Sequence, residues 1–233
     1  MSSGQLYAVL TGDLVRSSLL SVAQSKDAME RLRKAADEFA GVYPKSVVGR
    51  LDTFRHDSWQ LLLTRPELAL RAALYLRATL KMQSDAEVKY DTRVSIGVGL
   101  VESIAKRRIS DSRGAAFTRS GKGLDAMKDQ GLAFASTDKP SADESWIAQG
   151  VVPLLDCVVG DWTATESRAA HGALMGWTQE ETATRWSGDG ANVEQPTRQA
   201  VAKALVRAHW ATVDVVLESV ERAQKQPLEV ASG

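Results

Sequence analysis

The sequence contains a single cysteine and carries no net charge. Cys157 is the one cysteine among 233 residues, so the chain cannot form an intramolecular disulfide or a zinc site built from several cysteines. Lysine and arginine together number 29, as do aspartate and glutamate. This balance excludes binding of nucleic acid or anionic lipid through a broad basic surface, so any contact with nucleic acid is expected to be local.

Long apolar runs and a basic N-terminal region are also missing. The opening residues, MSSGQLYAVLTGD, lack the positive charge of a secretory signal, and no uncharged apolar run approaches the roughly 18 residues that span a bilayer. We therefore expect a cytoplasmic protein without a membrane partner. Hydrophobic residues make up 44% of the chain, enough for a substantial core in one large domain or two small ones.

The first 136 residues alternate between strand and helix patterns. The β-rich runs lie at 6–12, 47–54, 58–63, 92–101 and 131–136, and apolar residues follow helical spacing at 21–39, 67–83 and after Gly114. The order β-α-β-β-α-β-α-β predicts a ferredoxin-like α+β sandwich. We expect its helices to cover one face of a mainly antiparallel sheet.

The composition changes after residue 136. Residues 137–144 contain no large apolar side chain and are typical of a linker, and residues 145–225 follow helical patterns. The sequence therefore predicts two domains, at 1–136 and 145–225, and a disordered tail at 226–233. Cys157 lies in an apolar segment interrupted by Pro153 and is expected to be buried and inert.

Two aspartates follow strand patterns that a β-α-β-β unit places side by side. Asp13 ends the first run and Asp57 lies at the tip of the predicted hairpin. Two carboxylates there could bind Mg²⁺ together with nucleotide phosphates, and Ser17 and Ser18 follow where backbone N–H groups could bind phosphate. Alternatively, Asp13 caps the next helix and Asp57 is only a turn residue.

Motifs around these aspartates resemble those of class III nucleotidyl cyclase catalytic domains. LTGDLV at 10–15 is similar to the first metal-binding segment, FRHDSW at 54–59 to the second, RVSIGVG at 93–99 to a central strand and DSRGAAF at 111–117 to a later loop. The resemblance covers most of residues 6–136. It implies a cyclase-type sandwich that binds metal through Asp13 and Asp57, takes a purine nucleotide or cyclic nucleotide as ligand, and forms its site between two copies of the chain.

The same resemblance assigns roles to four further residues. Asp111 matches the purine-selecting aspartate, and Thr53 falls where the second purine-selecting residue is expected. The transition-state asparagine and arginine of the family fall at Thr118 and Lys122. Lysine lacks the bidentate fork of arginine, so Thr118 and Lys122 depart from the catalytic pattern of the family. Asp13 and Asp57, by contrast, follow its metal-binding pattern.

The C-terminal region contains two consecutive helix-start signals. Thr178 with Glu181 predicts a capping box, and Pro196-Thr197 opens a second helix after a polar stretch. The pair resembles a helix-turn-helix of the sigma-factor or response-regulator type, which implies contacts of the second helix with DNA phosphates and base edges. The implied DNA-binding residues are Thr197, Arg198, Gln199, Ala202, Lys203 and Arg207. The alternative is a helical packing or dimerisation module with a solvated charged face.

Tryptophan and histidine in this region suggest no site. Four of the six tryptophans, among them Trp177 and Trp186, lie in the predicted helices, where core packing is expected. His171 and His209 are far apart in the sequence and have no matched partner, so no metal site is predicted from them.

The combination of both halves also resembles the SatD family of small bacterial proteins over nearly the whole chain. We expect a homodimeric, nucleotide-responsive DNA-binding regulator with a degenerate cyclase-like sensor domain. The alternatives are an active nucleotidyl cyclase and a non-catalytic dimerisation protein, so enzymatic activity stays open.

Overall fold

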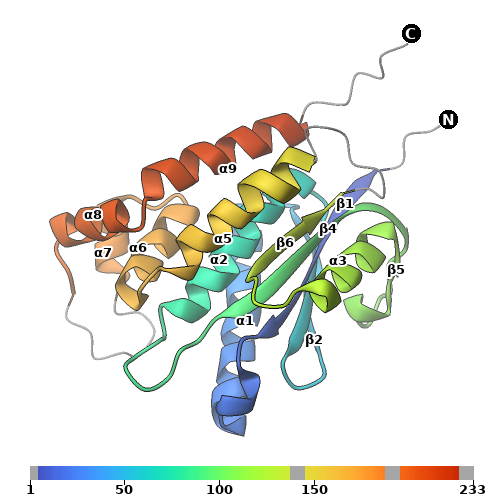
Figure 1. Ribbon diagram of the computed structural model, residues 1–233, viewed down its shortest axis with the longest axis horizontal. Coiled ribbons are helices and arrows are strands. Elements are labelled where there is room, and N and C mark those ends of the chain that lie inside the picture. The colour runs from blue at the N-terminus through green and yellow to red at the C-terminus, as the bar shows by residue number, and fades with distance from the viewer. Residues whose placement is uncertain (1–4, 137–144, 187–194, 226–233) are drawn as a thin grey trace.

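Four antiparallel strands form the centre of the molecule in the order β2-β3-β1-β4 (Figure 1). The computed structural model describes residues 5–136, 145–186 and 195–225. This strand order is that of a β-α-β-β-α-β unit and agrees with the ferredoxin-like sandwich expected from the sequence. In the described residues the strands are β1 (Leu6–Leu14), β2 (Val47–Phe54), β3 (Ser58–Leu63), β4 (Thr92–Ser103), β5 (Arg113–Gly114) and β6 (Leu132–Ala135).

Two helices, α1 (Val22–Val42) and α2 (Ala69–Lys81), cover one face of the sheet. The side chain of Ser21 caps α1 in a reciprocal capping box with Gln24, and α1 buries one apolar side. α2 follows a short helix, η2 (Pro66–Leu68), and every residue from Ala69 to Leu80 is buried. Elements therefore surround α2 on all sides, which explains its dense run of alanine and leucine.

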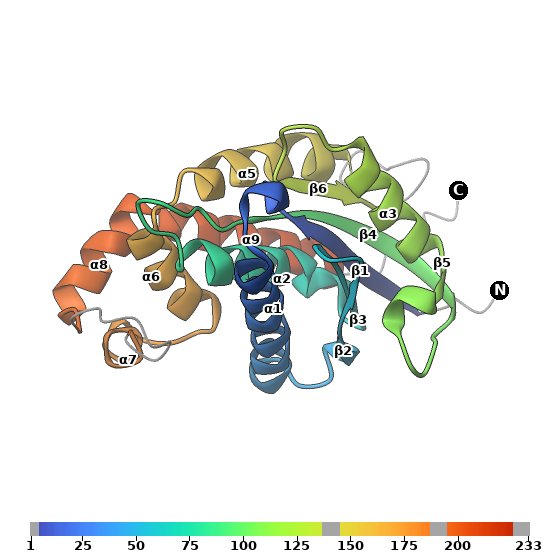
Figure 2. The same cartoon turned by 90° about the horizontal axis from the view of Figure 1, so that it is seen from below.

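The helix α3 (Ala115–Ala126) lies on the opposite face (Figure 2), so the expectation of helices on one face only is wrong. The reason is the alternation of β4. Ile96 and Val98 point into the main core, whereas Gly97 lets the backbone of α3 approach the strand. A Cβ atom at Gly97 would lie 2.3 Å from the carbonyl oxygen of Ala116. β6 follows α3 and pairs with β4 in parallel.

The C-terminal helices pack on α2 and on the sheet edge at β6. A π-helical turn (Ile147–Val151) leads into α5, so the helix is irregular next to Pro153, as expected. Apolar residues of α5, α6 and α9 belong to the same hydrophobic cluster as α1, α2 and β1. The helices are α5 (Val152–Gly160), α6 (Ala164–Leu174), α7 (Gln179–Thr184), α8 (Arg198–Arg207) and α9 (Trp210–Lys225).

This shared core bears on the expected domain organisation. Residues on both sides of the expected linker at 137–144 pack into one cluster. The linker and the tail at 226–233 lie outside the described residues, and the division into two domains stays a prediction. Among the described helices, none combines the length and apolarity needed to cross a membrane.

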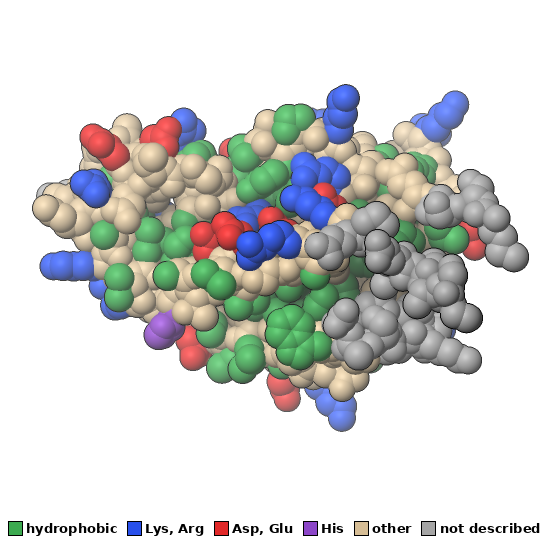
Figure 3. Space-filling model, turned by 90° about the horizontal axis from the view of Figure 1, so that it is seen from above, with side chains coloured by type: hydrophobic (Ala, Val, Ile, Leu, Met, Phe, Trp, Pro, Cys, Tyr) green, Lys and Arg blue, Asp and Glu red, His purple; other side chains and the backbone are tan. Residues whose placement is uncertain are grey.

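Only the inner side of α5 packs on the rest of the molecule. The face seen in Figure 3 carries exposed hydrophobic side chains among charged ones, and Trp146 and Leu154, near and within α5, are 62% and 70% exposed. Cys157 is exposed as well, so its expected burial is wrong. Apolar composition alone did not distinguish a helix buried all round from one with an open apolar side.

Candidate functional site

The candidate site is a hollow where β1 ends and β4 begins, bordered by β6 and α5. The predicted residues Asp13, Asp57, Ser17 and Ser18 all line it. Asp13 is brought there by strand pairing, because it lies opposite Ser58 of β3 on one side and opposite Arg93 of β4 on the other. The β-α-β-β unit thus places the two aspartates together, as the sequence predicted.

Asp13 forms a bidentate ion pair with Arg93. Nε of Arg93 lies 2.8 Å from Oδ1 of Asp13, and Nη2 lies 2.5 Å from Oδ2. The same guanidinium donates from Nη1 to the carbonyl oxygen of Met127, just after α3. The hydrogen bond to Asp13 raises the pKa of Arg93; burial opposes the rise, and the charges of Asp13 and Asp57 add to it. Arg93 is therefore a fixed cation within reach of both aspartates.

Asp57 accepts hydrogen bonds from two serines. Oγ of Ser17 donates to Oδ2 over 2.7 Å, and Oγ of Ser58 donates to Oδ1 over 3.2 Å. Ser17 therefore reaches the site through its side chain rather than through the backbone N–H expected from the sequence. Asp57 lies in the β2–β3 turn, which agrees with the alternative that it is a turn residue. The alternative role of Asp13 as a helix cap is wrong, because Ser21 caps α1.

The side chains around Asp13 do not fit a resident Mg²⁺ as they stand. Both oxygens of Asp13 accept from Arg93, and both oxygens of Asp57 accept from serines. Within the described ranges, no group of three or more His, Cys, Asp or Glu side chains could hold a metal ion. Mg²⁺ prefers carboxylates together with phosphate oxygens, so it would have to displace Arg93 from Asp13. The positive charge of the site is supplied by the protein itself.

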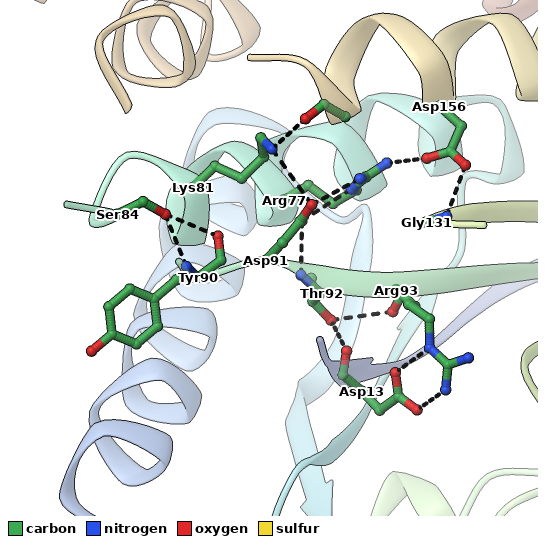
Figure 4. Close-up of polar contacts among 11 residues, drawn as sticks. Asp13, Arg77, Lys81, Ser84, Tyr90, Asp91, Thr92, Arg93, Gly131 and Asp156 are labelled. Atoms are coloured by element: carbon green, nitrogen blue, oxygen red, sulfur yellow. Dashed lines mark hydrogen bonds and ion pairs between the residues drawn. The ribbon is translucent and has the colours of Figure 1, made fainter. Parts of the chain in front are cut away.

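Hydrogen bonds link Asp13 to the helix α5 (Figure 4). Arg77, 2% exposed, donates to both oxygens of Asp91 over 3.1 and 2.9 Å and to Oδ1 of Asp156 over 2.6 Å. Thr92 continues the path, because its N–H donates to Asp91 and its hydroxyl donates to the carbonyl oxygen of Asp13. Burial lowers the pKa of Arg77, but the charges and hydrogen bonds of Asp91 and Asp156 outweigh it and raise the pKa.

This network was missed at the level of sequence. An arginine in a helix of leucine and alanine is the signal that could have found it, because a buried charge requires a partner. The partners themselves, Asp91 and Asp156, lie in separate elements and carry no local motif.

The remaining residues implied by the cyclase resemblance lie elsewhere. Thr118 and Lys122 are exposed and line a separate shallow groove at the start of α3. The side chain of Thr53 accepts a hydrogen bond from Arg33 of α1. The short helix η3 (Ile109–Asp111), which contains Asp111, lies on the other face of the sheet. The structure therefore does not bring Thr53 and Asp111 together. Asp52 instead contacts η3, accepting from the N–H and hydroxyl of Ser110.

The helix α8 has one packed and one open side. Val201 and Ala204 are buried against Ala183 of α7 and against Trp186, which follows that helix. The caps expected at Thr178 and Thr197 are both present, whereas the connection at 187–194 lies outside the described residues. The residues implied for DNA contact are Thr197, Arg198, Gln199, Ala202, Lys203 and Arg207. All of them are exposed except Ala202, which is half-buried. Arg207 donates a hydrogen bond from Nε to Glu166 of α6 over 3.1 Å.

No family model and no curated protein matches the chain. Among solved structures, the chain is similar to the catalytic core of a rhodopsin-guanylyl cyclase with converted specificity in complex with ATPαS. That match has 15% identity and a TM-score of 0.41, over 63% of this chain and 83% of the other. The guanylyl cyclase Cya2 matches with 16% identity and a TM-score of 0.38, over 56% and 74%. Similarity at this level does not assign a function to the chain.

Proposed function

We propose that the chain is a nucleotide-binding regulator whose cyclase-like half binds a phosphorylated purine without converting it. The observation that carries the proposal is the bidentate pair of Arg93 with Asp13. A guanidinium fork matches phosphate as well as it matches carboxylate, so Arg93 can exchange Asp13 for a ligand phosphate. Asp13 is meanwhile held away from the metal role that the cyclase resemblance implies.

The lining of the hollow holds six aspartates and four Lys or Arg side chains, so binding of an anion would depend on the groups at its rim. Arg16 and Lys128 are exposed at its rim, and Ser17 and Ser18 bring hydroxyl groups to the same side. Mg²⁺ would accompany a triphosphate only after Arg93 has left Asp13. The ligand is therefore expected to bind with or without the metal.

Conversion of a nucleotide requires the metal-binding and the transition-state residues of the family at one site, but a single copy of this chain holds them in two separate hollows. Asp13 and Asp57 line one hollow, and Thr118 and Lys122 line another. A ligand touches both sets only where a second copy supplies the second one, which supports a homodimer. In such a site Lys122 offers a point charge in place of the arginine fork of the family, which weakens stabilisation of a transferring phosphate.

Isothermal titration with ATP, GTP, cyclic AMP and cyclic GMP, with and without Mg²⁺, tests the proposal. We expect saturable binding of at least one purine nucleotide and no pyrophosphate release. Release of pyrophosphate that Asp57→Ala abolishes would establish the active-cyclase alternative. Absence of binding by every nucleotide would overturn the proposal and leave the alternative of a non-catalytic dimerisation protein.

DNA binding by α8 is the second part of the proposed regulator. It is supported by the open side of the helix, where Arg198, Gln199 and Lys203 are exposed while Val201 and Ala204 anchor the other side. Arg207 contributes less than the sequence implied, because Glu166 already neutralises it. A gel shift with genomic fragments at stated salt tests this part: Arg198→Ala and Lys203→Ala should each weaken binding, and Val206→Ala is the control.

A further inference from the structure

A second cavity, away from the hollow at Asp13, is lined by α1 on one side and by α6 and α7 on the other. Its volume is about 490 Å³, within the range of small-molecule sites. Arg31 and Lys34 of α1 line one wall, and Met82 after α2 lies at its base. None of its lining residues takes part in the nucleotide or DNA proposals.

Aromatic rings line the inner part of this cavity. Trp186 is 6% exposed and His171 is 8% exposed. The ring of His171 lies between Tyr75, at a centroid distance of 4.6 Å, and the edge of Trp177, at 5.8 Å. Trp177 and Trp186 border the cavity with the part of their rings that the core leaves uncovered, and planar ligands pack favourably against such rings. Trp177 and Trp186 thus pack with the core, as the sequence predicted, and also border this cavity.

Cationic groups surround these rings. The guanidinium of Arg185 lies over Trp177 at 4.5 Å, and that of Arg168 lies over Trp186 at 5.7 Å. Arg168 also donates to the carbonyl oxygens of Trp186 and Met82, which fixes its charge at the base of the cavity. Arg168 is half-buried, and a lower local dielectric constant strengthens the attraction of such a cation for an anion.

The acidic residues of the lining already have partners on the protein. Asp27 forms an ion pair with Arg31 over 2.7 Å, and Glu38 accepts from the hydroxyl of Tyr75 over 2.9 Å. Glu30 accepts from Arg33 over 3.3 Å. By contrast, the ammonium group of Lys34 makes no hydrogen bond or ion pair with any residue in the described ranges. A cation at the wall is therefore available to a ligand.

We propose that this cavity binds a small aromatic carboxylate, with its ring against Trp177 and Trp186 and its carboxylate near Lys34 and Arg185. The ring of the ligand packs on the aromatic side chains, and its carboxylate pairs with a cation that no protein carboxylate neutralises. A molecule bound there touches α1 on one side and α7 on the other. It stabilises the packing of the C-terminal helices on the sheet domain and raises the melting temperature of the folded chain.

Isothermal titration of the full chain with benzoate, 2-naphthoate and indole-3-acetate tests this proposal, with tryptophan fluorescence as a second readout. We expect saturable binding of at least one carboxylate at one site per chain, and at least about tenfold weaker binding of its neutral amide. Lys34→Ala should weaken binding about tenfold as well. Lys26→Ala is the matched control, because Lys26 lies exposed on the same helix outside the cavity and should leave binding unchanged.

Three results would overturn the proposal. The first is that no carboxylate binds in the millimolar range. The second is that the amides bind as tightly as the acids, since the cations would then play no part. The third is that Lys34→Ala and Lys26→Ala have equal effects, which would place the probe elsewhere on the protein.

Discussion

Arg93 and Asp13 face each other on neighbouring antiparallel strands and share two hydrogen bonds, Nε to Oδ1 over 2.8 Å and Nη2 to Oδ2 over 2.5 Å. The carbonyl oxygen of Met127 holds the same guanidinium from the side of α3. A protein cation therefore lies where the cyclase resemblance implies a metal ion. This arrangement favours binding of a phosphate over metal-dependent cyclisation.

Removal of Arg93 should create a metal site. In Arg93→Ala both oxygens of Asp13 are released next to Asp57, so affinity for Mn²⁺ should rise several-fold above that of the unchanged protein. Isothermal titration with Mn²⁺ measures the change, and Arg50→Ala, at an exposed arginine elsewhere, is the control. Tight binding of Mn²⁺ by the unchanged chain, lost in Asp13→Asn, would contradict the account.

Loss of Arg77 should destabilise the protein strongly. Arg77→Met leaves Asp91 and Asp156 near one another without their buried cation, and breaking a buried pair costs about 3–5 kcal/mol in the free energy of unfolding. Urea denaturation measures the loss. A double-mutant cycle with Asp156→Asn should show coupling between the two residues, whereas additive effects would mean that the ion pair does not join α2 to α5.

A glycine of β4 and a glycine of the helix α3 that packs on it should respond in opposite directions to the same substitution. Gly97→Ala places a Cβ atom 2.3 Å from the carbonyl oxygen of Ala116, so α3 must move away from β4 at a cost of about 1–3 kcal/mol or more. Gly121→Ala, within α3, meets nothing within 4 Å and should stabilise the helix by about 0.5–1 kcal/mol. Thermal melts of both variants check the pair. Equal effects would show that α3 does not pack closely on β4.

The pair of Glu166 with Arg207 should contribute stability only above acidic pH. Burial raises the pKa of Glu166, but hydrogen bonds from Thr163 and Arg207 outweigh it and keep the pKa below the ordinary 4.5. A lowered folded pKa means that the contribution is complete above about pH 4.5 and is lost as the pH falls through the folded value.

Glu166→Gln tests this pH dependence. Glutamine retains the capping bond to Thr163 but not the charge, so the variant should lose about 0.5 kcal/mol at neutral pH. Denaturation at several pH values should show the two proteins converging in acid. A difference that stays constant with pH would mean that the charge of Glu166 does not contribute.

Much of the fold was predictable because its signals are local. The β-rich composition of β1, the alternation in β4, the helical spacing in α1 and the capping motifs at Thr178 and Thr197 each depend on residues close together in the sequence. Likewise, Asp13 and Asp57 could be placed together because a β-α-β-β unit has few possible topologies.

The rest depends on contacts between distant residues. The partnership of Asp13 with Arg93 is set by strand register, and that of Arg77 with Asp156 by the packing of α5 on α2, so neither leaves a pattern in the sequence. The position of α3 depends on small residues at Gly97 and Gly99, whose role shows only once a helix packs there. The core packing expected of Trp177 and Trp186 is confirmed, because Trp186 belongs to a core cluster and Trp177 packs against the main core.

Nucleotide binding and turnover, measured on the same sample, decide whether the chain binds a purine nucleotide without converting it. The chain is titrated calorimetrically with GTP and with ATP in the presence of Mg²⁺, and pyrophosphate is then assayed in the cell contents. We expect saturable binding of one of them without pyrophosphate. In buffer without Mg²⁺, binding should be about tenfold weaker in Arg93→Ala and unchanged in Arg50→Ala, both checked by thermal melts for folding. Pyrophosphate released in proportion to protein, or binding unaffected by Arg93→Ala, would contradict the proposed function.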